Sequence, residues 1–565
     1  MTPGWAGLAH WRILALGAGG ELRFLSTWKA WRDDPQRPRM LHFVAIVDEP
    51  VNGDLLPLAA GDPELQPLAQ ALARQWYGLL PGVHRLVFEQ GHVLLTLCIG
   101  ASEKMLRQLD FHADSVFLHE ASVNLKSLAR RCRRGTRIVV VDGTGAIGAA
   151  LQRHGFLLHE SDSALVCGIF APSWEPRGAF PLQGPVTGNC IVVGAGLAGS
   201  AVAASLARRG WNVRVLEAGP AAASGASGLP AGVLVPHGSP DDNLLSRLSR
   251  DGVRATLQQA HELLRSGLDW EPSGVLEVHS EAPAQRKRVA ADAGTVWSRP
   301  ADGEQLQRAA LASSAPADWH EQAAWIRPAA LVDAWLATPG VSLRTGAKVA
   351  SLSRDAGGWQ ALDASGTVLA QGALVIVAAA MESRQLLPGL SLQAVRGQVS
   401  WAPHAGPLQL PPFPVNGDGS FIPSVPTAAG PVWLCGAGFD RIDTDLAARE
   451  VDQQANLVRL QRLLPSVARQ LAPAFADASA QAWIGIRCAS TDRRPLAGPL
   501  DDRQSDGLWL STAMGSRGLT FAALCGELIA ARLHGEPLPL SQSLARALYP
   551  RRQKNPPAAC AAART

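Results

Sequence analysis

The chain has 565 residues, of which 47% are hydrophobic and 18% charged, and its formal net charge is +4. This length accommodates two to four domains, and the composition excludes a disordered or fibrous protein. The small net charge also excludes a polycation, so any nucleic acid would have to be bound by local basic patches.

Eight cysteines lie far apart in the sequence and form no CxxC pair. This spacing predicts reduced thiols in a cytoplasmic protein. The longest apolar run, residues 190–206, is interrupted by three glycines and is shorter than the ~20 residues that span a membrane. We therefore expect no membrane association, and we further expect a monomer that binds no metal ion.

In residues 1–170 predicted strands alternate with predicted helices. Strands are expected at 12–16, 41–47, 91–99, 115–118 and 137–141, and helices at 22–31, 65–76 and 146–153. A glycine-rich turn, residues 17–20, follows the first strand. This order predicts an α/β domain with a doubly wound sheet of the Rossmann type.

The first domain resembles Rossmann-type methyltransferases in this order of elements. Residues 41–43, 80–86 and 155–156 are similar to those of one family, the bifunctional tRNA wobble-uridine modification proteins of the MnmC type. In that family the domain methylates tRNA with S-adenosylmethionine as the donor. The resemblance therefore implies a methyltransferase-like fold for residues 1–170.

The positions that would bind the methyl donor depart from the family pattern. Ala15 replaces the leading acid of the glycine motif, Glu21 its last glycine and Arg23 its asparagine. Val47 stands where an acid would hold the donor's ribose. Asp48 comes one position late, and neighbouring side chains of a strand point to opposite faces.

Two further donor-site segments are also changed. Residues 99–101 are Ile-Gly-Ala where the family has Phe-Gly-Asp, and residues 119–123 replace its catalytic Asp-Gly-Phe-Ala-Pro. A carboxylate at Glu21 would also face the donor's own carboxylate, which is unfavourable. We therefore expect a degenerate domain that keeps the fold and has lost donor binding, with compensation open only to Asp48 or Glu120.

The densest basic cluster lies near the end of this domain. It comprises Lys126, Arg130, Arg131, Arg133, Arg134 and Arg137. Two interpretations remain open, a solvated helix end and a set of contacts to tRNA phosphates. Residues 171–188 are rich in proline and glycine, which predicts a linker to the second domain.

Residues 189–217 predict a βαβ unit, with a strand at 189–193, a helix at 197–209 and a strand at 212–216. The intervening turn has the pattern GxGxxG. Gly194 allows a sharp turn, Gly196 allows the backbone to approach a pyrophosphate, and Gly199 allows close packing of helix and strand.

An acid follows this unit at the spacing of a dinucleotide fold. Glu217 lies 18 positions after Gly199, close to the roughly 20 expected of an acid that binds a ribose hydroxyl. Strand, glycines, helix, strand and acid together predict dinucleotide binding.

The next segment separates flavin from nicotinamide. Ser224, Ala226 and Ser227 belong to a Gly/Ser-rich stretch directly after the second strand. Small residues with hydroxyl groups there can contact phosphate and let an isoalloxazine ring lie against the backbone. This stretch resembles the D-amino-acid oxidase and glycine oxidase class, and the resemblance implies FAD as the cofactor.

We expect the FAD domain to cover residues 189–565, with an inserted α+β substrate domain at roughly 270–500. A helix is expected at 242–264, strands at 274–279 and 373–379, paired strands at 341–343 and 347–352, and a hairpin turn at 417–420. Residues 395–399, Val-Arg-Gly-Gln-Val, resemble a signature shared by the MnmC family and the amino-acid oxidases.

Two C-terminal segments carry the catalytic residues implied by the resemblance. Residues 485–495 are similar to a segment whose arginine binds the substrate carboxylate over the flavin, which here is Arg487. A strand at 507–512 leads to Gly515, Ser516, Arg517 and Gly518 and then to a helix at 522–533. These residues would place a second helix N-terminus and a cation near the flavin, whose pyrimidine edge becomes anionic on reduction.

The resemblance implies oxidation of the carboxymethylaminomethyl group of 5-carboxymethylaminomethyl-2-thiouridine in tRNA. A hydride leaves the methylene for FAD, water hydrolyses the imine, and 5-aminomethyl-2-thiouridine remains. The intact family then methylates this product to 5-methylaminomethyl-2-thiouridine. Two alternatives are a glycine- or sarcosine-type amine oxidase, which would lack a methyltransferase-like partner, and a tRNA-binding protein without turnover, which would not need the flavin motifs.

Overall fold

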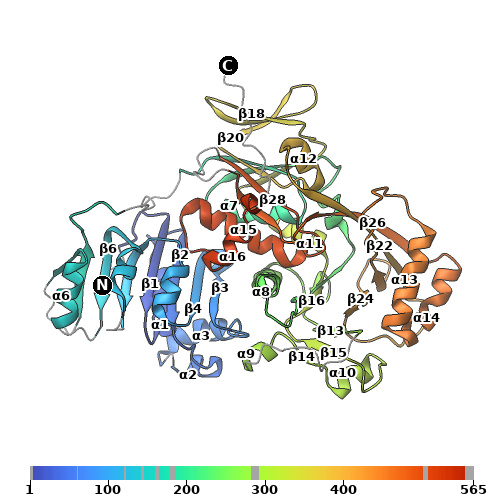
Figure 1. The fold of residues 1–565 in the computed structure, drawn as a ribbon, viewed down its shortest axis with the longest axis horizontal. Helices are drawn as coiled ribbons and strands as arrows, with labels where there is room; N and C mark the ends of the chain where they lie inside the picture. Colours follow the sequence, from blue (N-terminus) through green and yellow to red (C-terminus); the bar gives the residue numbers. More distant parts are fainter. Residues whose placement is uncertain are drawn as a thin grey trace. The chain divides into compact units, whose positions relative to one another are not determined.

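The computed structural model describes residues 4–59, 61–119, 123–141, 145–159, 165–176, 186–280, 292–500 and 507–553. Glu120 and half of the expected linker, residues 177–185, lie outside these residues. The chain divides into two compact units (Figure 1). The first contains residues 1–187 and 527–546, and the second contains residues 188–526 and 547–565.

The first unit is built on one eight-stranded sheet. Its strands are β1 (His10–Leu16), β2 (Met40–Val47), β3 (Gly82–Phe88), β4 (Val93–Ile99), β5 (Ala113–Leu118), β6 (Cys132–Val140), β7 (Phe156–His159) and β8 (Val166–Phe170). They are ordered β3-β4-β2-β1-β5-β6-β8-β7, and β4, β2, β1, β5 and β6 run parallel. The five strands expected from the sequence are present, whereas β3, β7 and β8 were not expected.

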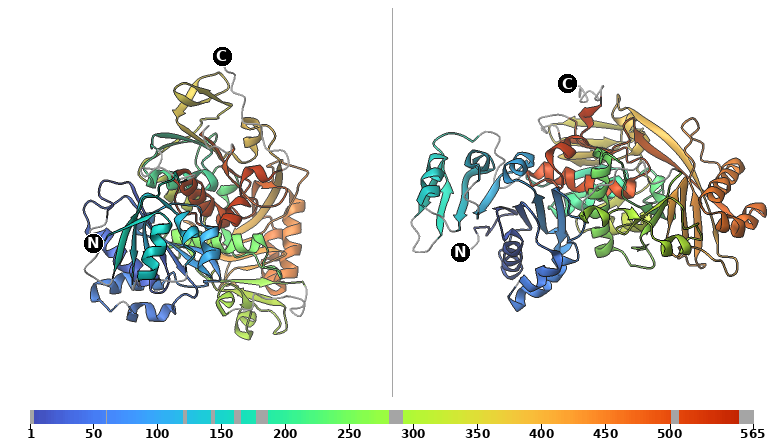
Figure 2. Two further views of the ribbon diagram at one scale, coloured as in Figure 1. Left: turned by 60° about the vertical axis from the view of Figure 1, so that its left-hand side comes forward. Right: turned by 60° about the horizontal axis from the view of Figure 1, so that its bottom comes forward.

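Helices cover both faces of this sheet (Figure 2). They are α1 (Gly20–Asp33), α2 (Leu56–Ala59), α3 (Gln66–Ala73), α4 (Ser102–Gln108), α5 (Leu125–Ala129) and α6 (Gly145–Arg153). Side chains of α1 and α3, including Phe24 and Leu68, belong to one core cluster. Those of α4, α5 and α6, including Leu106 and Leu151, belong to another. The doubly wound fold is therefore confirmed.

The second unit contains the predicted βαβ unit within a six-stranded sheet. β9 (Asn189–Val193), α7 (Leu197–Arg208) and β10 (Asn212–Leu216) match the expected ranges to within one residue. The other strands are β17 (Val341–Arg344), β21 (Leu374–Val377), β27 (Leu496–Pro499) and β28 (Leu508–Thr512). Their order is β17-β10-β9-β21-β28-β27, with only β27 antiparallel to its neighbour.

A second eight-stranded sheet forms most of the inserted region. Its strands are β13 (Val275–Val278), β14 (Arg299–Pro300), β15 (Ala317–His320), β22 (Leu392–Pro403), β23 (Val415–Gly417), β24 (Gly419–Val425), β25 (Val432–Gly436) and β26 (Gln481–Ser490). Helices α13 (Glu450–Leu463) and α14 (Pro465–Ala476) pack against it around Trp433 (Figure 2). The expected hairpin is confirmed, since Gly417 pairs with Gly419.

One expected pairing is wrong. The ranges 341–343 and 347–352 were expected to pair with each other, but β17 pairs with β10. The next strand, β18 (Ser351–Asp355), belongs to a separate sheet with β19 (Gly358–Leu362) and β20 (Val368–Gly372). The sequences of these two short runs do not indicate which strands they pair with, because strand pairing is decided by tertiary packing.

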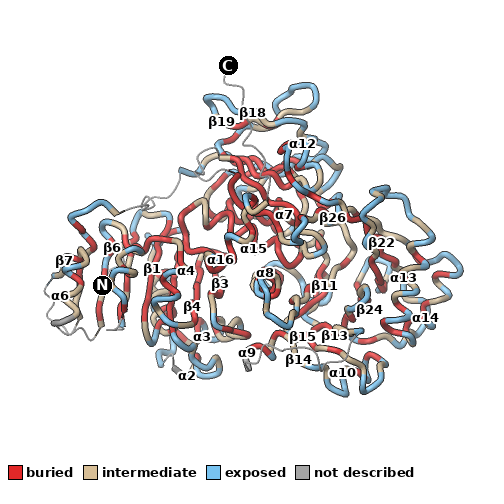
Figure 3. Tube along the Cα trace, viewed as in Figure 1, coloured by how far each residue is buried: buried red, intermediate tan, exposed pale blue. Residues whose placement is uncertain are grey.

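The remaining elements complete the second unit and the C-terminal segment. They are β11 (Gly232–Leu234), β12 (Trp270–Glu271), β16 (Ala324–Ile326), α8 (Leu244–Leu263), α9 (Asp292–Thr295), α10 (Gly303–Arg308), α11 (Pro328–Leu336), α12 (Ser383–Leu386), α15 (Gly518–His534) and α16 (Gln542–Arg546). Buried residues follow the central strands of each unit (Figure 3).

None of the described helices is long and apolar enough to cross a membrane. The seven cysteines within the described residues are all unpaired, and only Cys167 among them is not fully buried.

Candidate active site

The glycine turn after β9 is required by close backbone packing. Gly194 has a φ of 107°, a conformation that favours glycine. A Cβ on Gly194 would lie 2.6 Å from the carbonyl oxygen of Ala378, and one on Gly199 would lie 1.9 Å from that of Gly194. Neither backbone oxygen can move as a side chain could, so both positions exclude any larger residue.

The loop after β10 closes around the N-terminus of α7. The backbone N–H of Leu197 donates to Ser227 Oγ at 3.0 Å. A Cβ on Gly196 would lie 3.0 Å from the same oxygen. Ala226 lies next to Ser227 in a short 3-10 turn and is exposed, and the Ser224 hydroxyl donates to the carbonyl of Ala221.

Glu217 is fixed at the carboxyl end of β10. Its Oε2 accepts from the N–H of Ala195 at 2.8 Å, and its Oε1 accepts from the N–H of Gly219 at 2.8 Å. A helix N-terminus suits phosphate, and a carboxylate at this position suits a ribose hydroxyl. The residues present therefore fit the adenosine diphosphate portion of FAD.

The start of α15 lies next to the start of α7. Gly515 donates to the carbonyl of Cys488 at 2.7 Å, which ties the turn after β28 to β26. A Cβ on Gly518 would lie 3.1 Å from Leu197 Cδ1. Ser516 is exposed within this turn. The two predicted glycine-containing turns are thus brought together, with two helix N-termini at one place.

Arg487 lies on β26, opposite the Arg-Gly-Gln signature of β22. Its guanidinium crosses over Gly397, since a Cβ there would lie 2.6 Å from Arg487 Nη2. Nη1 donates to the carbonyl of Gly438 at 3.0 Å, and Cζ lies 4.8 Å from the ring centroid of Phe439. Burial lowers the pKa of Arg487 to about 10. Among the described residues no carboxylate forms an ion pair with it.

The signature itself holds a loop rather than a ligand. Arg396 is buried, forms an ion pair with Asp452 and donates to the carbonyl of Ala447. Gln398 exchanges two hydrogen bonds with the backbone of Arg449. These bonds fix the loop of residues 437–449, which carries Phe439 against Arg487. Sequence reasoning recognised this signature but not the loop that it holds.

Arg517 belongs to a second group of charged side chains. Burial lowers the pKa of Arg517, the charge of Arg493 lowers it further, and Glu277 opposes the shift. Burial also lowers the pKa of His237, and the same three charged residues act on it. Sequence reasoning missed His237 and Glu277, because an isolated histidine and a strand glutamate carry no motif.

The carboxyl ends of the parallel strands β1, β2 and β5 meet at one edge of the sheet in the first unit, where the resemblance implies a methyl-donor site. Glu21 is buried in the first turn of α1, and this burial raises its pKa. Arg23 Nη2 lies 2.6 Å from His119 Nε2, and Arg23 Cζ lies 4.7 Å from the ring centroid of Phe117. The replacement side chains therefore contact one another across this edge of the sheet.

The position that would hold the donor's ribose also lacks a suitably placed acid. Val47 is buried and Asp48 is exposed, so the shifted acid does not take the orientation of the residue it would replace.

Half of the basic cluster is used inside the first unit. Arg131 donates to the carbonyl of Leu109, Arg133 pairs with Asp114, and Arg134 donates to the carbonyl of Pro172. The other members, Lys126, Arg130 and Arg137, are exposed. Neither interpretation covers the three internal contacts, and the three exposed residues leave both interpretations open.

Comparison with known proteins identifies the class of the second unit. Residues 189–532, more than half of the chain, match the family model of FAD dependent oxidoreductases. The chain therefore contains an FAD-dependent oxidoreductase of the D-amino-acid oxidase type. Residues 63–122 match the model of an S-adenosyl-L-methionine-dependent methyltransferase.

Near full-length relatives define the family. A tRNA 5-methylaminomethyl-2-thiouridine biosynthesis bifunctional protein MnmC from Polaromonas naphthalenivorans is 49% identical over 97% of this chain and 91% of its own length. The protein of the same name from Verminephrobacter eiseniae is 47% identical over 97% of both chains. The chain belongs to the MnmC family.

A solved structure shares the fold of the second unit. Glycine oxidase from Bacillus cereus aligns with a TM-score of 0.50 at 20% identity, over 61% of this chain and 95% of its own.

Proposed function

We propose that the second unit removes the carboxymethyl group from 5-carboxymethylaminomethyl-2-thiouridine at the wobble position of tRNA, leaving 5-aminomethyl-2-thiouridine. The observation that carries this proposal is Arg487, a half-buried cation that forms no ion pair with a carboxylate among the described residues. A cation in this state is prepared for an anionic ligand, and a two-point guanidinium contact suits a carboxylate.

The chain's own residues would orient the substrate. Arg487 binds the carboxylate and fixes the adjacent methylene, while Arg517 and the N-terminus of α15 favour negative charge nearby. When bound, FAD supplies the two-electron acceptor for the methylene C–H. The amine must be neutral for its lone pair to assist, and addition of water to the resulting imine then releases the amine and a two-carbon oxo acid.

A large substrate agrees with the surroundings of Arg487. Phe439, in contact with its guanidinium, is 61% exposed, and Ile442 and Leu446 of the same loop are also exposed. Aromatic side chains stack on unpaired bases of RNA. These residues favour a nucleoside in a tRNA loop over a free amino acid as the substrate. Because tRNA is modified in the cytoplasm, we expect the protein to act there.

We further propose that the first unit no longer transfers methyl groups. Glu21 and the Arg23–His119 pair lie where the donor would bind, and a buried carboxylate beside the donor's carboxylate is unfavourable. S-Adenosylmethionine titrated into the full chain should give no calorimetric signal at micromolar concentrations. Micromolar binding would contradict this part of the proposal.

The oxidase activity is tested with the full chain under anaerobic conditions. The purified protein should be yellow, and tRNA that carries the carboxymethylaminomethyl group should bleach its flavin absorbance. tRNA lacking that group is the matched control and should not. Nucleoside analysis of the reacted tRNA should show the aminomethyl product.

The runner-up, a small-molecule amine oxidase, predicts a different result. Glycine or sarcosine would then bleach the flavin at millimolar concentrations while modified tRNA would not. A protein that stays colourless when FAD is supplied would contradict both oxidases and leave only a tRNA-binding role.

A further inference from the structure

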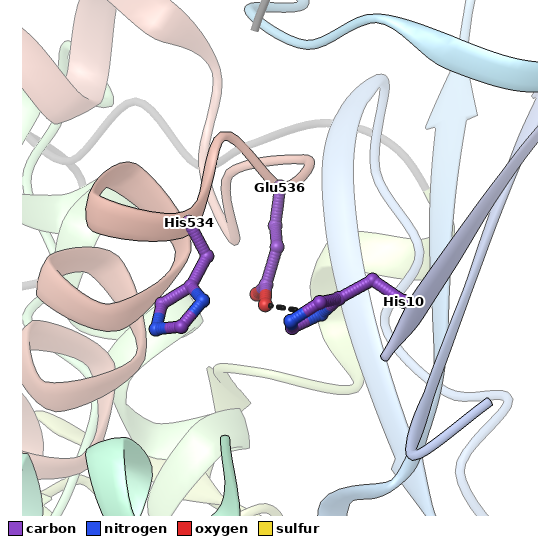
Figure 4. Close-up of side chains that lie close together, drawn as sticks. All are labelled: His10, His534 and Glu536. Atoms are coloured by element: carbon purple, nitrogen blue, oxygen red, sulfur yellow. Dashed lines mark ion pairs between the residues drawn. The ribbon is translucent and has the colours of Figure 1, made fainter. Parts of the chain in front are cut away.

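A buried cluster of imidazoles and one carboxylate lies in the first unit and shares no residue with the sites above. His10 begins β1, His534 ends α15, and Glu536 follows in the next turn (Figure 4). All three side chains are buried, and one ligand atom from each lies within 4.8 Å of the others. Figure 4 shows the three side chains directed toward a common space.

Two separations at Glu536 match those of ligands around an ion. His10 Nδ1 lies 3.3 Å from Glu536 Oε1, and His42 Nε2 lies 3.5 Å from the same oxygen. Charge-assisted hydrogen bonds are shorter, at about 2.7–2.9 Å. Bonds of about 2.0–2.1 Å to a tetrahedral zinc ion separate its ligand atoms by about 3.3–3.5 Å.

We propose that His10, His534 and Glu536 bind one zinc ion, with His42 beside Glu536 to orient its carboxylate. Imidazole nitrogen and carboxylate oxygen are ordinary zinc ligands, and a water molecule completes a tetrahedral site that has three protein ligands. This goes beyond the proposed reaction, and it departs from the expectation that the chain binds no metal. The sequence could not reveal it, because 492 positions separate His42 from His534.

The position of the site assigns it a structural role. β1 runs from His10 to Leu16, and the glycine turn follows at its other end. Seven strand residues extend roughly 20 Å, so the ion would lie far from the donor edge of the sheet. Two further bonds join the same segments, from Arg12 to the carbonyl of Gly535 at 3.2 Å and from Arg85 to that of Pro537 at 2.5 Å. The ion would thus fasten residues 527–546 to β1 and β2.

The competing explanation is a metal-free network of histidines hydrogen-bonded to Glu536. Metal content separates the two. The full chain, purified with a tag that contains no histidine and then gel-filtered, should contain about one zinc per chain by mass spectrometry. His10→Asn and Glu536→Gln should each lower this content at least tenfold.

The matched control is His320→Asn in the second unit. His320 is equally buried and lies 2.8 Å from Glu277, but it is outside the cluster, so zinc content should not change. The flavin content of each variant reports whether the second unit has folded.

A measurement on the wild-type chain avoids any doubt about variant folding. Protein stripped with a chelator should melt several degrees lower, and added ZnCl₂ alone should restore the melting temperature. The proposal is overturned if the wild type contains less than a tenth of an equivalent and does not take up zinc on titration. Retention of zinc by both cluster variants would overturn it equally.

Discussion

At the scale of single residues, the proposed reaction depends most on Arg487, the proposed ligand of the substrate carboxylate. Replacing it with lysine keeps one charge but loses the planar two-point contact, and glutamine loses both. We expect kcat/KM for modified tRNA to fall roughly 30- to 1,000-fold, or about 2–4 kcal/mol, with glutamine the more severe. FAD content should stay at one per chain.

The control for this substitution is Arg462→Gln, which removes one exposed positive charge paired with Asp418. Steady-state kinetics should give wild-type values for it. An Arg487→Gln variant that keeps more than a third of wild-type kcat/KM would show that Arg487 does not bind the substrate carboxylate.

Gly397 tests the same contact without altering a charged group. An added Cβ would lie 2.6 Å from Arg487 Nη2, and the flexible guanidinium must then move. Gly397→Ala should raise KM about tenfold with a smaller change in kcat, since about 1.4 kcal/mol of binding is lost. Gly438→Ala, whose Cβ meets nothing within 4 Å, should leave KM unchanged. Equal effects of the two variants would contradict this explanation.

At the scale of elements, the βαβ unit depends on one close approach. Gly199→Ala places a Cβ 1.9 Å from a backbone oxygen, so α7 must move away from β9 or the turn must open. The purified variant should contain less than a tenth of the wild-type FAD by absorbance. Gly225→Ala lies in the neighbouring loop with open space around its Cβ and should retain FAD. Full FAD content in Gly199→Ala would show that the turn tolerates a side chain.

Asp492 joins the C-terminal turn to the end of β26. Burial alone would raise its pKa, but hydrogen bonds and charge from Arg552 outweigh this and leave the pKa below its usual value. Its two oxygens accept from Arg552 Nε at 2.8 Å and Nη2 at 3.0 Å. A depressed folded-state pKa contributes stability that is present above the ordinary value near 4 and lost as the pH falls below it.

Asp492→Asn should therefore lower the free energy of unfolding at pH 7, and with it the melting temperature. The loss should be about 1 kcal/mol, because the carboxylate is partly exposed. The difference should shrink as the pH approaches 3. Thermal melts monitored by flavin fluorescence between pH 3.5 and 7 check this, and Asp418→Asn, in an exposed ion pair, is the control. A difference that does not vary with pH would assign the loss to packing.

The sequence predicted elements well where the signal was local. The βαβ unit was placed to within one residue because strand, glycines and helix follow one another directly. β3, β7 and β8 were missed although β3 pairs with the nearby β4 and β7 with the nearby β8. β3 carries His84 and Arg85 at buried positions, so its sequence lacks the apolar pattern of a buried strand. The site followed the same rule: Arg487 and the glycines come from contiguous motifs, while His237 and Glu277 meet Arg517 only through folding.

At the scale of the whole molecule, the first unit is not a contiguous stretch of sequence. The sequence assigned nothing beyond residue 170 to it, whereas residues 527–546 belong to the same compact unit. Buried Arg12 and Arg85 donate to carbonyls of that segment. No local pattern in either stretch indicated the other.

Residues 1–187 expressed alone should therefore lack a cooperative thermal transition by circular dichroism, because buried guanidiniums lose their acceptors. The same fragment joined by a flexible linker to residues 527–546 should recover one. A sharp transition in residues 1–187 alone would show that residues 527–546 are not required for this unit to fold.

Helix α15 starts with residues of the second unit and finishes with residues of the first. A shortened protein that lacks residues 1–187 would expose apolar side chains in the last turns of α15 to water. It would also leave Glu536 as an isolated charge. Selection for the oxidase alone would then preserve the methyltransferase fold even if, as proposed, its own reaction is lost, and such a loss would proceed by point substitutions rather than by deletion.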